Sequence, residues 1–307
     1  MYLRWLRGVI FATLGRRWAE RWHAAEVSNP QPETGAYGFA IRGPLAGHRA
    51  LRPVVRLCGE IWLGDAAPND IRPPESADSA RVSLALADGS HLVVSRESDR
   101  RFEARLFGGP PRSLDDLAHP YLAPVAALAH RWRGTPALHG AALSVGGKAF
   151  ALIAAREAGK TTTAAALVAA RQAELLSDDL VVVDDGLVLP GPRSIDLRPA
   201  GSDLLGLDGD VVRHGERRRR LVHDDAPAAP LTCCFHLRFG DAESLEVMSA
   251  AERLAALKDQ LYWPTLGGAP RDLLALAALP QLVLTRRRGQ VGLDRALQLV
   301  LDYVGGG

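Results

Sequence analysis

The pattern of apolar and polar positions is clearest near the middle of the chain. Apolar runs at residues 137–145 and 149–154 predict two strands, and Gly146-Gly147-Lys148 between them predicts a tight hairpin. A short loop follows, and residues 160–170 then repeat small and apolar side chains as a helix does. The centre of the chain is therefore predicted to run strand, hairpin, strand, loop and helix.

The next apolar run, residues 174–177, ends in two adjacent acids, Asp178 and Asp179. Residues 180–184 and 187–189 predict a second hairpin directly after the acids. We therefore expect the acid pair at the junction of two strands. Strands that alternate with helices favour an α/β fold.

Residues 35–110 carry a different pattern, in which short apolar runs are separated by Gly, Pro and Asp. The pattern predicts a small β-rich domain ahead of the α/β part of the chain. It contains no constellation of acids, bases or metal ligands that would indicate a site. Its predicted strands are residues 37–42, 54–63, 81–86, 92–95 and 102–107.

The remainder, residues 111–307, is predicted to form the larger α/β domain. Ser113 has the character of a helix N-cap, and the helix after it should be broken into two at His119-Pro120 and Pro124. The arginine-rich run 213–220 is typical of a solvated polar loop. Later segments predict strands at 231–239 and 281–286, helices at 250–261 and 293–303, and a buried helix at 273–279.

Residues 1–34 are predicted to form an amphipathic helix followed by a polar linker. Apolar residues such as Trp5, Leu14 and Trp22 recur at roughly helical spacing, with arginines elsewhere on the helical wheel. Gly15-Arg16-Arg17 follows the apolar run where a signal peptide would have a small-residue cleavage site. We expect this helix to dock on its own protein or a partner subunit, with a membrane surface as the alternative.

Composition narrows the class of protein. The chain has 307 residues, 47% of them apolar and 23% charged, as in ordinary globular proteins. A net charge of +2 gives no general case for nucleic-acid binding. Its three cysteines have no metal-binding spacing and favour a reducing cytoplasm. No apolar run approaches the roughly 20 residues of a transmembrane helix, so no such segment is expected.

The loop before the central helix has the chemistry of a phosphate-binding loop. Gly159-Lys160-Thr161 fits its closing motif, in which backbone N–H groups hold phosphate oxygens, Lys reaches the outer phosphates and a hydroxyl ligates Mg²⁺. Ala154 stands where the motif has its first Gly. Lys160 is one of three lysines among 37 basic residues, and a compact ammonium suits this role. The alternative interpretation is an ordinary strand, turn and helix with a surface lysine.

The central stretch resembles one family. Leu138-His139-Gly140, Gly146-Gly147, Gly159-Lys160-Thr161 and Asp178-Asp179 occur in the order and at the spacing seen in HPr kinase/phosphorylase and its kinase-like relatives. The segment beginning at Tyr37 is similar to the entry strand of relatives that accompany peptide-modifying gene clusters, including lasso-peptide kinases. The motif match covers about fifty residues.

The resemblance implies a fold and an activity. The fold would be a P-loop domain of the HPr kinase and phosphoenolpyruvate carboxykinase type, with a smaller β-rich N-terminal domain. The activity would be transfer of the γ-phosphoryl group of ATP, with Mg²⁺, to a hydroxyl, most simply a serine of a protein or peptide. The chain departs from the family at Ala154-Ala155 and Glu157-Ala158, where Gly, a polar residue and Ser-Gly are usual. The C-terminal signature of the bifunctional enzymes is missing, so phosphorolysis is not implied.

The resemblance also implies roles for single residues. Asp178 would accept the proton of the acceptor hydroxyl, and Thr161 and Asp179 would hold Mg²⁺. Which acid does which is left open, since neighbouring residues of a strand face opposite ways. His139 would hydrogen-bond the transferred group or orient Asp178. Lys160 would act on the phosphates, within a nucleotide-binding set of Ala155, Arg156, Glu157, Ala158, Gly159, Lys160, Thr161 and Thr162, and the candidate acceptor-binding residues are Asp196, Arg198, Arg217 and Arg218.

Two other functions stay open. The first is a nucleotide-binding regulatory or scaffold protein whose loop has lost turnover. The second is a peptide-docking module in which the β-rich domain does the binding and the loop is vestigial. A kinase is favoured because Lys160 and both carboxylates occur together. The sequence determines neither the acceptor nor whether the protein forms a homo-oligomer.

Overall fold

The computed structural model describes residues 33–306 except for residues 55, 67–79, 87–88, 110–111, 213–215, 223–224 and 265–269. The chain divides into two units, Met1–Pro32 and Glu33–Gly307. The amphipathic helix predicted for the first unit lies outside the described residues and stays a prediction. Everything below concerns the second unit.

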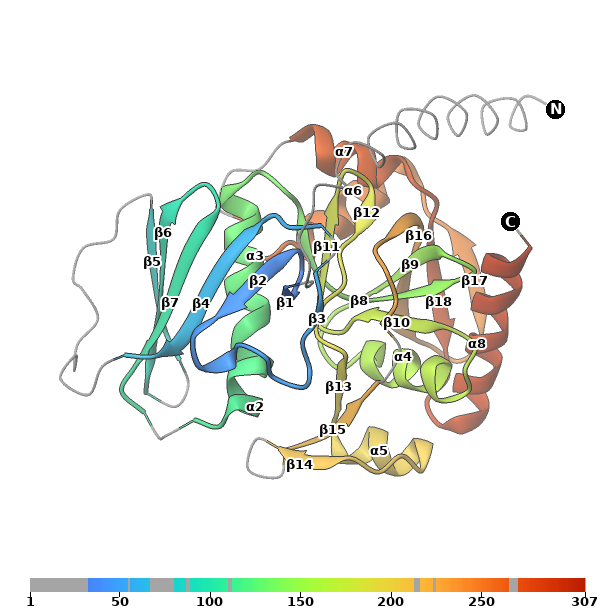
Figure 1. The fold of residues 1–307 in the computed structure, drawn as a ribbon. Coiled ribbons are helices and arrows are strands. Elements are labelled where there is room, and N and C mark those ends of the chain that lie inside the picture. Colours follow the sequence, from blue (N-terminus) through green and yellow to red (C-terminus); the bar gives the residue numbers. More distant parts are fainter. Residues whose placement is uncertain are drawn as a thin grey trace. The chain divides into compact units, whose positions relative to one another are not determined.

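The first sheet of this unit has seven strands in the order β3-β1-β2-β4-β7-β6-β5 (Figure 1). The predicted strand at 37–42 starts only at Phe39, because Tyr37 and Gly38 have positive φ angles and form the turn between β1 and β2. The predicted strand at 54–63 likewise starts late, at Gly59. The strands are β1 Thr34–Ala36, β2 Phe39–Arg42, β3 Arg52–Pro53, β4 Gly59–Asp65, β5 Arg81–Ala85, β6 His91–Ser98 and β7 Arg101–Phe107, and a short 3₁₀ turn, η1 Gly43–Leu45, follows β2.

A helical segment follows this sheet and packs against it. Ser113 caps α2 (Leu114–Asp116), and the chain kinks at His119, whose φ and ψ of −155° and 124° lie outside the helical region. The break predicted at His119-Pro120 is confirmed. Pro124 causes no break, because it lies in the first turn of α3 (Leu122–Trp132), where no intrahelical N–H is needed. Between α2 and α3 lies the π-type turn η2, Leu117–Tyr121.

Helix α3 joins the two large sheets. Its buried side chains share one apolar core with Phe39 and Phe102 of the first sheet and with Leu180 and Val182 of the second. The sequence analysis divided the chain at residue 110, and this core draws on residues from both sides of that boundary. Helix α3 therefore packs against both sheets, and Leu180, the residue directly after the acid pair, belongs to the same core.

The second sheet carries the predicted loop. Strands β9, β16 and β18 run parallel, so their carboxyl ends lie at one edge of the sheet. Strand β8 is antiparallel to β9 and begins at that same edge, where Gly140 pairs with Ile153. The strands of this sheet are β8 Ala137–Val145, β9 Lys148–Ile153, β10 Glu174–Ser177, β11 Leu180–Asp184, β12 Leu187–Val188, β16 Ala229–Phe239, β17 Ser244–Val247 and β18 Gln281–Arg286.

Helices cover both faces of this sheet (Figure 1). Helices α4 (Lys160–Ala169) and α8 (Gln290–Gly305) share a core with Phe150 of β9 and Phe235 of β16. Helices α6 (Ala250–Asp259) and α7 (Pro270–Ala278) pack on the other face through Leu257 and Leu276. The prediction that 273–279 is a buried helix is wrong about burial, because only Leu276 of α7 is buried and Leu274 is 57% exposed.

A small third sheet completes the arrangement. It has the order β13-β15-β14, with β13 Ser194–Leu197, β14 Asp210–Val212 and β15 Arg217–Leu221, and α5 (Pro199–Leu205) follows β13. The predicted polar loop at 213–220 is wrong for residues 217–220, which form β15; residues 213–215 lie outside the described part. Charge alone suggested a solvated loop, but Asp196 lies opposite Arg219 in the strand pair.

The protein is a mixed α/β structure, as the sequence predicts at the level of fold class. Among the helices in the described part of the chain, none combines the length and the apolar character that crossing a bilayer requires.

Candidate functional site

The predicted phosphate-binding loop runs from the end of β9 to the start of α4. Its last residue, Gly159, has a φ of 91°, a left-handed conformation that favours glycine. A Cβ at this position would also lie 2.4 Å from Nη2 of Arg286. The left-handed turn therefore favours glycine at position 159, and a larger residue would also have to displace the guanidinium of Arg286. The first N–H groups of α4 have no partner inside the helix, which makes the loop a suitable anion-binding site.

The missing first glycine of the motif does not strain this loop. Ala154 is not among the residues with positive φ, and its side chain is buried in the core beneath α4. The left-handed non-glycine residue of the loop is Glu157, with a φ of 66°. The backbone of the loop therefore accommodates a Cβ at position 154.

Lys160 points into the curve of this loop. Its ammonium donates hydrogen bonds to the carbonyl oxygens of Ala154, at 2.7 Å, and Ala155, at 3.1 Å. The residue is only 7% exposed, and burial lowers the pKa of its amine, while the charges of Asp179 and Asp178 act in the opposite direction. The lysine and both acids therefore interact electrostatically across one site.

Asp178 and Asp179 lie between strands β10 and β11, which both pair with β8. Ser177 at the end of β10 pairs with Ala142, and Leu180 at the start of β11 pairs with His139, so the register is unchanged across the two acids. Asp179 has a φ of 74°, which is rare for a residue other than glycine and is typical of functional sites. The irregular backbone lets both carboxylates face one cavity instead of opposite faces of the strand.

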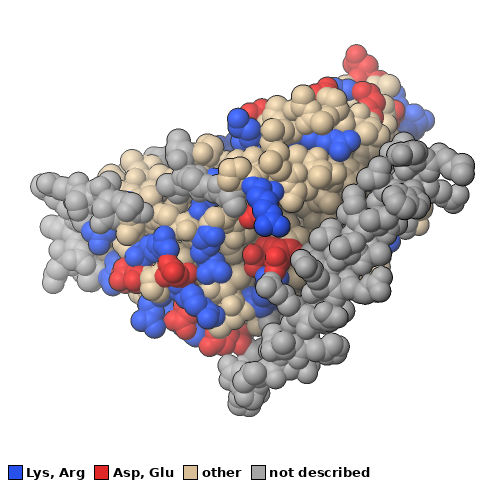
Figure 2. Space-filling view, turned by 90° about the horizontal axis from the view of Figure 1, so that it is seen from above, with Lys and Arg blue, Asp and Glu red and all other residues tan. Residues whose placement is uncertain are grey.

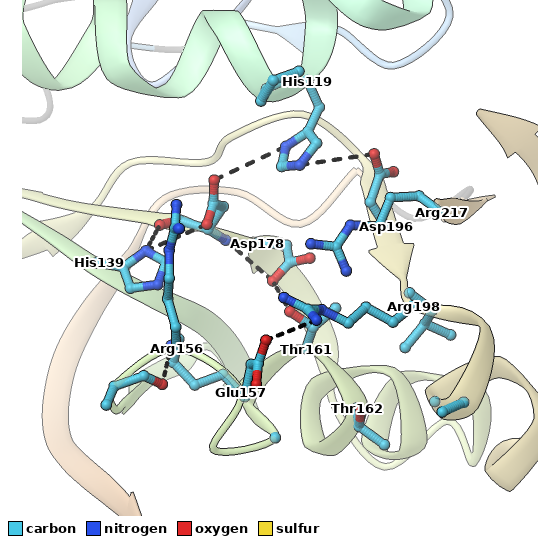
Figure 3. A pocket seen from close by; sticks show the side chains of 18 of the residues that line it. His119, His139, Arg156, Glu157, Thr161, Thr162, Asp178, Asp196, Arg198 and Arg217 are labelled. Atoms are coloured by element: carbon cyan, nitrogen blue, oxygen red, sulfur yellow. Dashed lines mark hydrogen bonds and ion pairs between the residues drawn. The ribbon is translucent and has the colours of Figure 1, made fainter. Parts of the chain in front are cut away.

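Asp178 contacts the phosphate-binding loop directly. Its Oδ1 accepts a hydrogen bond from Oγ1 of Thr161 at 3.2 Å (Figure 3). Burial, reinforced by the negative charges of Asp179 and Asp196, raises the pKa of Asp178 to about 7. The two hallmarks recognised in the sequence, Gly-Lys-Thr and Asp-Asp, therefore meet through a side-chain hydrogen bond.

The stability of the ligand-free protein should depend on the ionisation of Asp178. Because the pKa of Asp178 is raised from 3.8 to about 7, the folded protein binds more protons than the unfolded chain between these values. Its contribution to stability is therefore lost as the pH rises through that window. We expect Asp178→Asn to gain stability relative to wild type, by on the order of a few kcal/mol, between pH 4.5 and pH 8.

Urea unfolding of both proteins at a series of pH values checks this expectation. The comparison with wild type is needed because other groups titrate nearby; burial lowers the pKa of His130 to about 4, for example. Parallel stability curves for the two proteins would mean that Asp178 titrates normally.

Asp179 faces two histidines. Its Oδ1 lies 3.3 Å from Nδ1 of His139, and its Oδ2 lies 4.0 Å from Nδ1 of His119. Nδ1 of His139 also lies 3.1 Å from the backbone oxygen of Asp179. Both neighbours of this nitrogen are acceptors, so Nδ1 carries the proton. Burial and the nearby Lys160 lower the pKa of His139, which keeps the ring neutral.

His139 thus orients Asp179 and not Asp178, the acid to which the sequence analysis had linked it. The glycine that follows it allows this position, since a Cβ on Gly140 would lie 2.8 Å from the carbonyl oxygen of Leu152. The Leu-His-Gly segment of β8 therefore packs closely against β9 beside His139.

A second network supports the far side of the site; Asp196 is one of the residues predicted from the sequence, whereas His119 and Arg219 are not. His119 reaches from Asp179 to Asp196, with 3.9 Å between its Nε2 and Oδ2 of Asp196 (Figure 3). Asp196 in turn accepts two hydrogen bonds from the buried guanidinium of Arg219, at 2.8 and 2.7 Å. Arg219 also donates to a carboxylate oxygen of Asp115 at 2.8 Å. The sequence gives no sign of the role of Arg219, because this residue lies in an arginine-rich run of the kind that usually forms a solvated loop.

Arg219 should be essential for stability. Its side chain is 0% exposed, and removing it would leave Asp196 buried without its counter-charge. Breaking a buried ion pair in this way costs about 3–5 kcal/mol. We expect Arg219→Ala to lose about that much stability in chemical unfolding. Arg218→Ala is the matched control from the same strand, because Arg218 is only half-buried, and equal losses in both variants would contradict the assignment.

The phosphate-binding loop, the acid pair and the two histidines line one cavity of about 1430 Å³. This exceeds the roughly 300–1000 Å³ of a typical small-ligand pocket and leaves room for two reactants. Of the residues singled out in the sequence, Ala158 and Arg218 do not line it: Ala158 packs against the core, and Arg218 alternates to the other face of β15. The predicted residues that do line it are His139, Ala155, Arg156, Glu157, Gly159, Lys160, Thr161, Thr162, Asp178, Asp179, Asp196, Arg198 and Arg217 (Figure 3).

Other residues of the lining were not foreseen. Phe239 and Arg286 end the parallel strands β16 and β18, and a topological argument about strand ends could have placed them beside the loop. Tyr262 packs edge-on against His139, with ring centroids 5.9 Å apart, and carries no sequence signal of its own. On the face seen in Figure 2, basic and acidic side chains are mixed, in keeping with the small net charge.

Few side chains of the site could ligate a metal ion. Among the residues with described positions, no group of three or more His, Cys, Asp or Glu could hold an ion by itself. The adjacent hydroxyl of Thr161 and carboxylate of Asp178 offer two oxygen ligands. Mg²⁺ usually takes only one or two carboxylates and completes its shell with phosphate oxygens and water.

Comparison with known proteins adds no family assignment: no protein-family model matches the chain, and no curated protein matches it. Functional inference therefore rests on the geometry of the site.

Proposed function

We propose that this chain is an ATP-dependent phosphotransferase of the HPr kinase-like type, which transfers the γ-phosphoryl group to a hydroxyl of a protein or peptide. The observation that carries the proposal is the hydrogen bond between Thr161 and Asp178, which joins the lysine-bearing loop to the acid pair inside one cavity. Phosphoryl transfer requires positioning and charge neutralisation more than covalent catalysis, and this arrangement offers both.

The nucleotide would bind by its phosphates at the loop between β9 and α4. The free N–H groups at the start of α4 donate to phosphate oxygens. The ammonium of Lys160 already points into the loop, where it holds two carbonyl oxygens, and would exchange these for the outer phosphates. Arg156 lines the same cavity and adds positive charge near the phosphates.

Thr161 and Asp178 would hold Mg²⁺. The sequence analysis paired Thr161 with Asp179, but Asp178 is the acid within hydrogen-bond distance of the hydroxyl, which favours Asp178 for this role. An ion held by these two oxygens would supply neutralisation of the phosphate charge. Asp178 would be ionised when it holds the ion, although burial and the charges of Asp179 and Asp196 raise the pKa of this acid to about 7 in the ligand-free protein.

Asp179 would accept the proton of the acceptor hydroxyl. Its side chain is 28% exposed and opens to the cavity, whereas Asp178 lies against the loop. His139 holds one carboxylate oxygen and leaves the other for the substrate side, where His119 lies. The acceptor oxygen forms a bond to the γ-phosphorus, the bond from that phosphorus to the β,γ-bridging oxygen breaks, and the hydroxyl proton passes to Asp179.

The acceptor would occupy the part of the cavity away from the loop. Apolar and aromatic side chains line this part, among them Leu84, Pro124 and Trp263. The indole N–H of Trp263 donates to the carbonyl oxygen of Pro124 at 3.2 Å, which fixes the ring. A hydroxyl carried by a peptide with apolar neighbours fits such a surface better than a small, fully polar acceptor.

A labelled-phosphate experiment tests the proposal. The purified chain is incubated with Mg-ATP labelled at the γ-phosphate and with peptide libraries that carry one fixed Ser, Thr or Tyr. We expect label in the serine library and matching release of ADP. Binding of Mg-ATP without transfer or ADP release would contradict the proposal and would favour a nucleotide-binding regulatory protein.

A further inference from the structure

Arg286 ends strand β18 at the edge of the sheet where the phosphate-binding loop lies. Its strand is parallel to β16, which is parallel to β9, so the ends of all three strands meet at the loop. The residue is 3% exposed, yet it lines the cavity beside Gly159 and Lys160. A buried guanidinium at this place raises the question of what balances its charge.

The contacts of Arg286 do not balance that charge. Nη1 donates to the carbonyl oxygen of Arg287 at 3.2 Å, and the guanidinium lies over the ring of Phe239, 4.8 Å from its centroid. Its Nε is buried and has no hydrogen-bond acceptor in the part of the chain that the structure describes. The nearby carboxylate of Glu243 is engaged by Arg287 and Arg295 instead.

The buried guanidinium of Arg219 provides a contrast. Arg219 is equally buried, and two carboxylates, those of Asp196 and Asp115, accept its hydrogen bonds. Within the described residues, Arg286 forms no ion pair with any acid. An uncompensated buried charge is strongly destabilising, so such a residue is retained for a reason other than the stability of the ligand-free fold.

The surroundings of Arg286 are positive, which increases the cost. Burial, and then the charge of Arg288, lowers the pKa of Arg286, but a guanidinium stays protonated in proteins. Nη2 packs against the backbone of Gly159, directly before the positive N-terminal end of the ten-residue helix α4. Lys160 supplies a further cation to the same cavity. The acids of the cavity, Asp178 and Asp179, interact with Lys160, and none of the described acids pairs with Arg286, so a phosphate group is the counter-charge that this end of the loop would accept.

We propose that Arg286 is a phosphate-binding residue of the nucleotide site, and that its guanidinium and the Lys160 ammonium together hold the outer phosphates of a nucleoside triphosphate. The inference rests on the proposed function and extends it to a residue that belongs to no recognised motif in this chain. A planar guanidinium can make two parallel hydrogen bonds to a phosphate, which an ammonium cannot. Phe239 holds the guanidinium plane in place for this contact.

The variant Arg286→Met should separate the stability of the ligand-free protein from its affinity for nucleotide. Arg286→Met keeps a long side chain over Phe239 and removes the unpaired charge. The ligand-free variant should unfold at a temperature at least as high as wild type, because an uncompensated buried charge is lost. Its affinity for a non-hydrolysable Mg-ATP analogue should nevertheless fall by about 10- to 100-fold, the loss expected for charge-assisted hydrogen bonds.

Two further variants complete the experiment. Arg286→Lys keeps the charge but not the paired geometry, and its affinity should lie between those of wild type and Arg286→Met. Arg287→Met is the matched control, because Arg287 is the next residue, is exposed and pairs with Glu243 on the surface. Its affinity should stay within about threefold of wild type. Titration calorimetry with the analogue and with inorganic triphosphate measures all four proteins, and the second probe isolates contacts to phosphate.

Three results would overturn the assignment of Arg286 to the phosphates. Wild-type affinity in Arg286→Met would overturn the inference and leave the proposed function standing. An unfolding temperature several degrees below wild type would show that the guanidinium serves the fold, and would overturn it as well. If wild type binds neither the analogue nor triphosphate, the proposed function fails and this inference fails with it.

Discussion

Replacing Lys160 with Ala is expected to reduce phosphoryl transfer by about 10²- to 10³-fold, the scale seen when one charge-stabilising donor is removed from an active site. Lys160 is the ammonium that points into the loop, and neither of the other two lysines, Lys148 and Lys258, lines the cavity. The loss should appear in both nucleotide affinity and turnover, because the lysine would contact the outer phosphates before and during transfer.

Transfer of labelled phosphate and analogue binding measure the two effects. Lys148→Ala is the control, because this lysine lies at the exposed start of β9, outside the cavity. Thermal unfolding shows whether the Lys160 variant remains folded; it should, since its ammonium contacts only carbonyl oxygens of the loop. A folded Lys160→Ala protein with wild-type transfer would remove the loop from the mechanism.

Asp179→Asn is expected to separate chemistry from binding. If Asp179 accepts the proton of the acceptor hydroxyl, its amide variant should lose about 10²- to 10⁴-fold in turnover, the usual contribution of a general base. Affinity for the Mg-ATP analogue should change little, because the acid near Thr161 is Asp178. Asparagine can still accept a hydrogen bond from His139, which preserves the local arrangement.

Asp178→Asn provides the contrast. That variant should lose the effect of Mg²⁺ on nucleotide affinity, whereas Asp179→Asn should retain it. Single-turnover transfer with saturating nucleotide distinguishes a chemical defect from a binding defect. If Asp179→Asn turns over normally and Asp178→Asn keeps its response to Mg²⁺ but loses turnover, the two acids have the opposite roles, which are the roles first assigned from the sequence.

The sequence predicted the strand, loop and helix around Gly159 well because local patterns define them. The hairpin glycines fix the β8–β9 turn, and Gly159 fixes the start of α4, so strand, loop and helix follow from residues close together in the chain. The junction at Asp178 was also predicted, since an apolar run ending in acids has few other interpretations. What the pattern could not reveal was the left-handed backbone at Asp179, which brings both acids to one cavity.

The sequence failed where distant segments define the structure. Arg217–Leu221 looked like a solvated charge run, yet it forms β15, because Asp196 and Asp115, 23 and 104 residues away, accept the hydrogen bonds of Arg219. His119 gave only a kink signal, and its contact with Asp179 depends on how α3 packs between the sheets. No pattern within a short stretch of sequence predicts either of these contacts.

The central claim is that the lysine-bearing loop and the acid pair act on the same triphosphate. The most direct test is the dissociation constant of a non-hydrolysable ATP analogue, measured with and without Mg²⁺, in wild type and Asp178→Asn. We predict that Mg²⁺ tightens binding to wild type by at least about tenfold, or 1.4 kcal/mol, and that Asp178→Asn abolishes this gain. Binding that does not respond to Mg²⁺ in wild type, or that responds equally in Asp178→Asn, would contradict the claim.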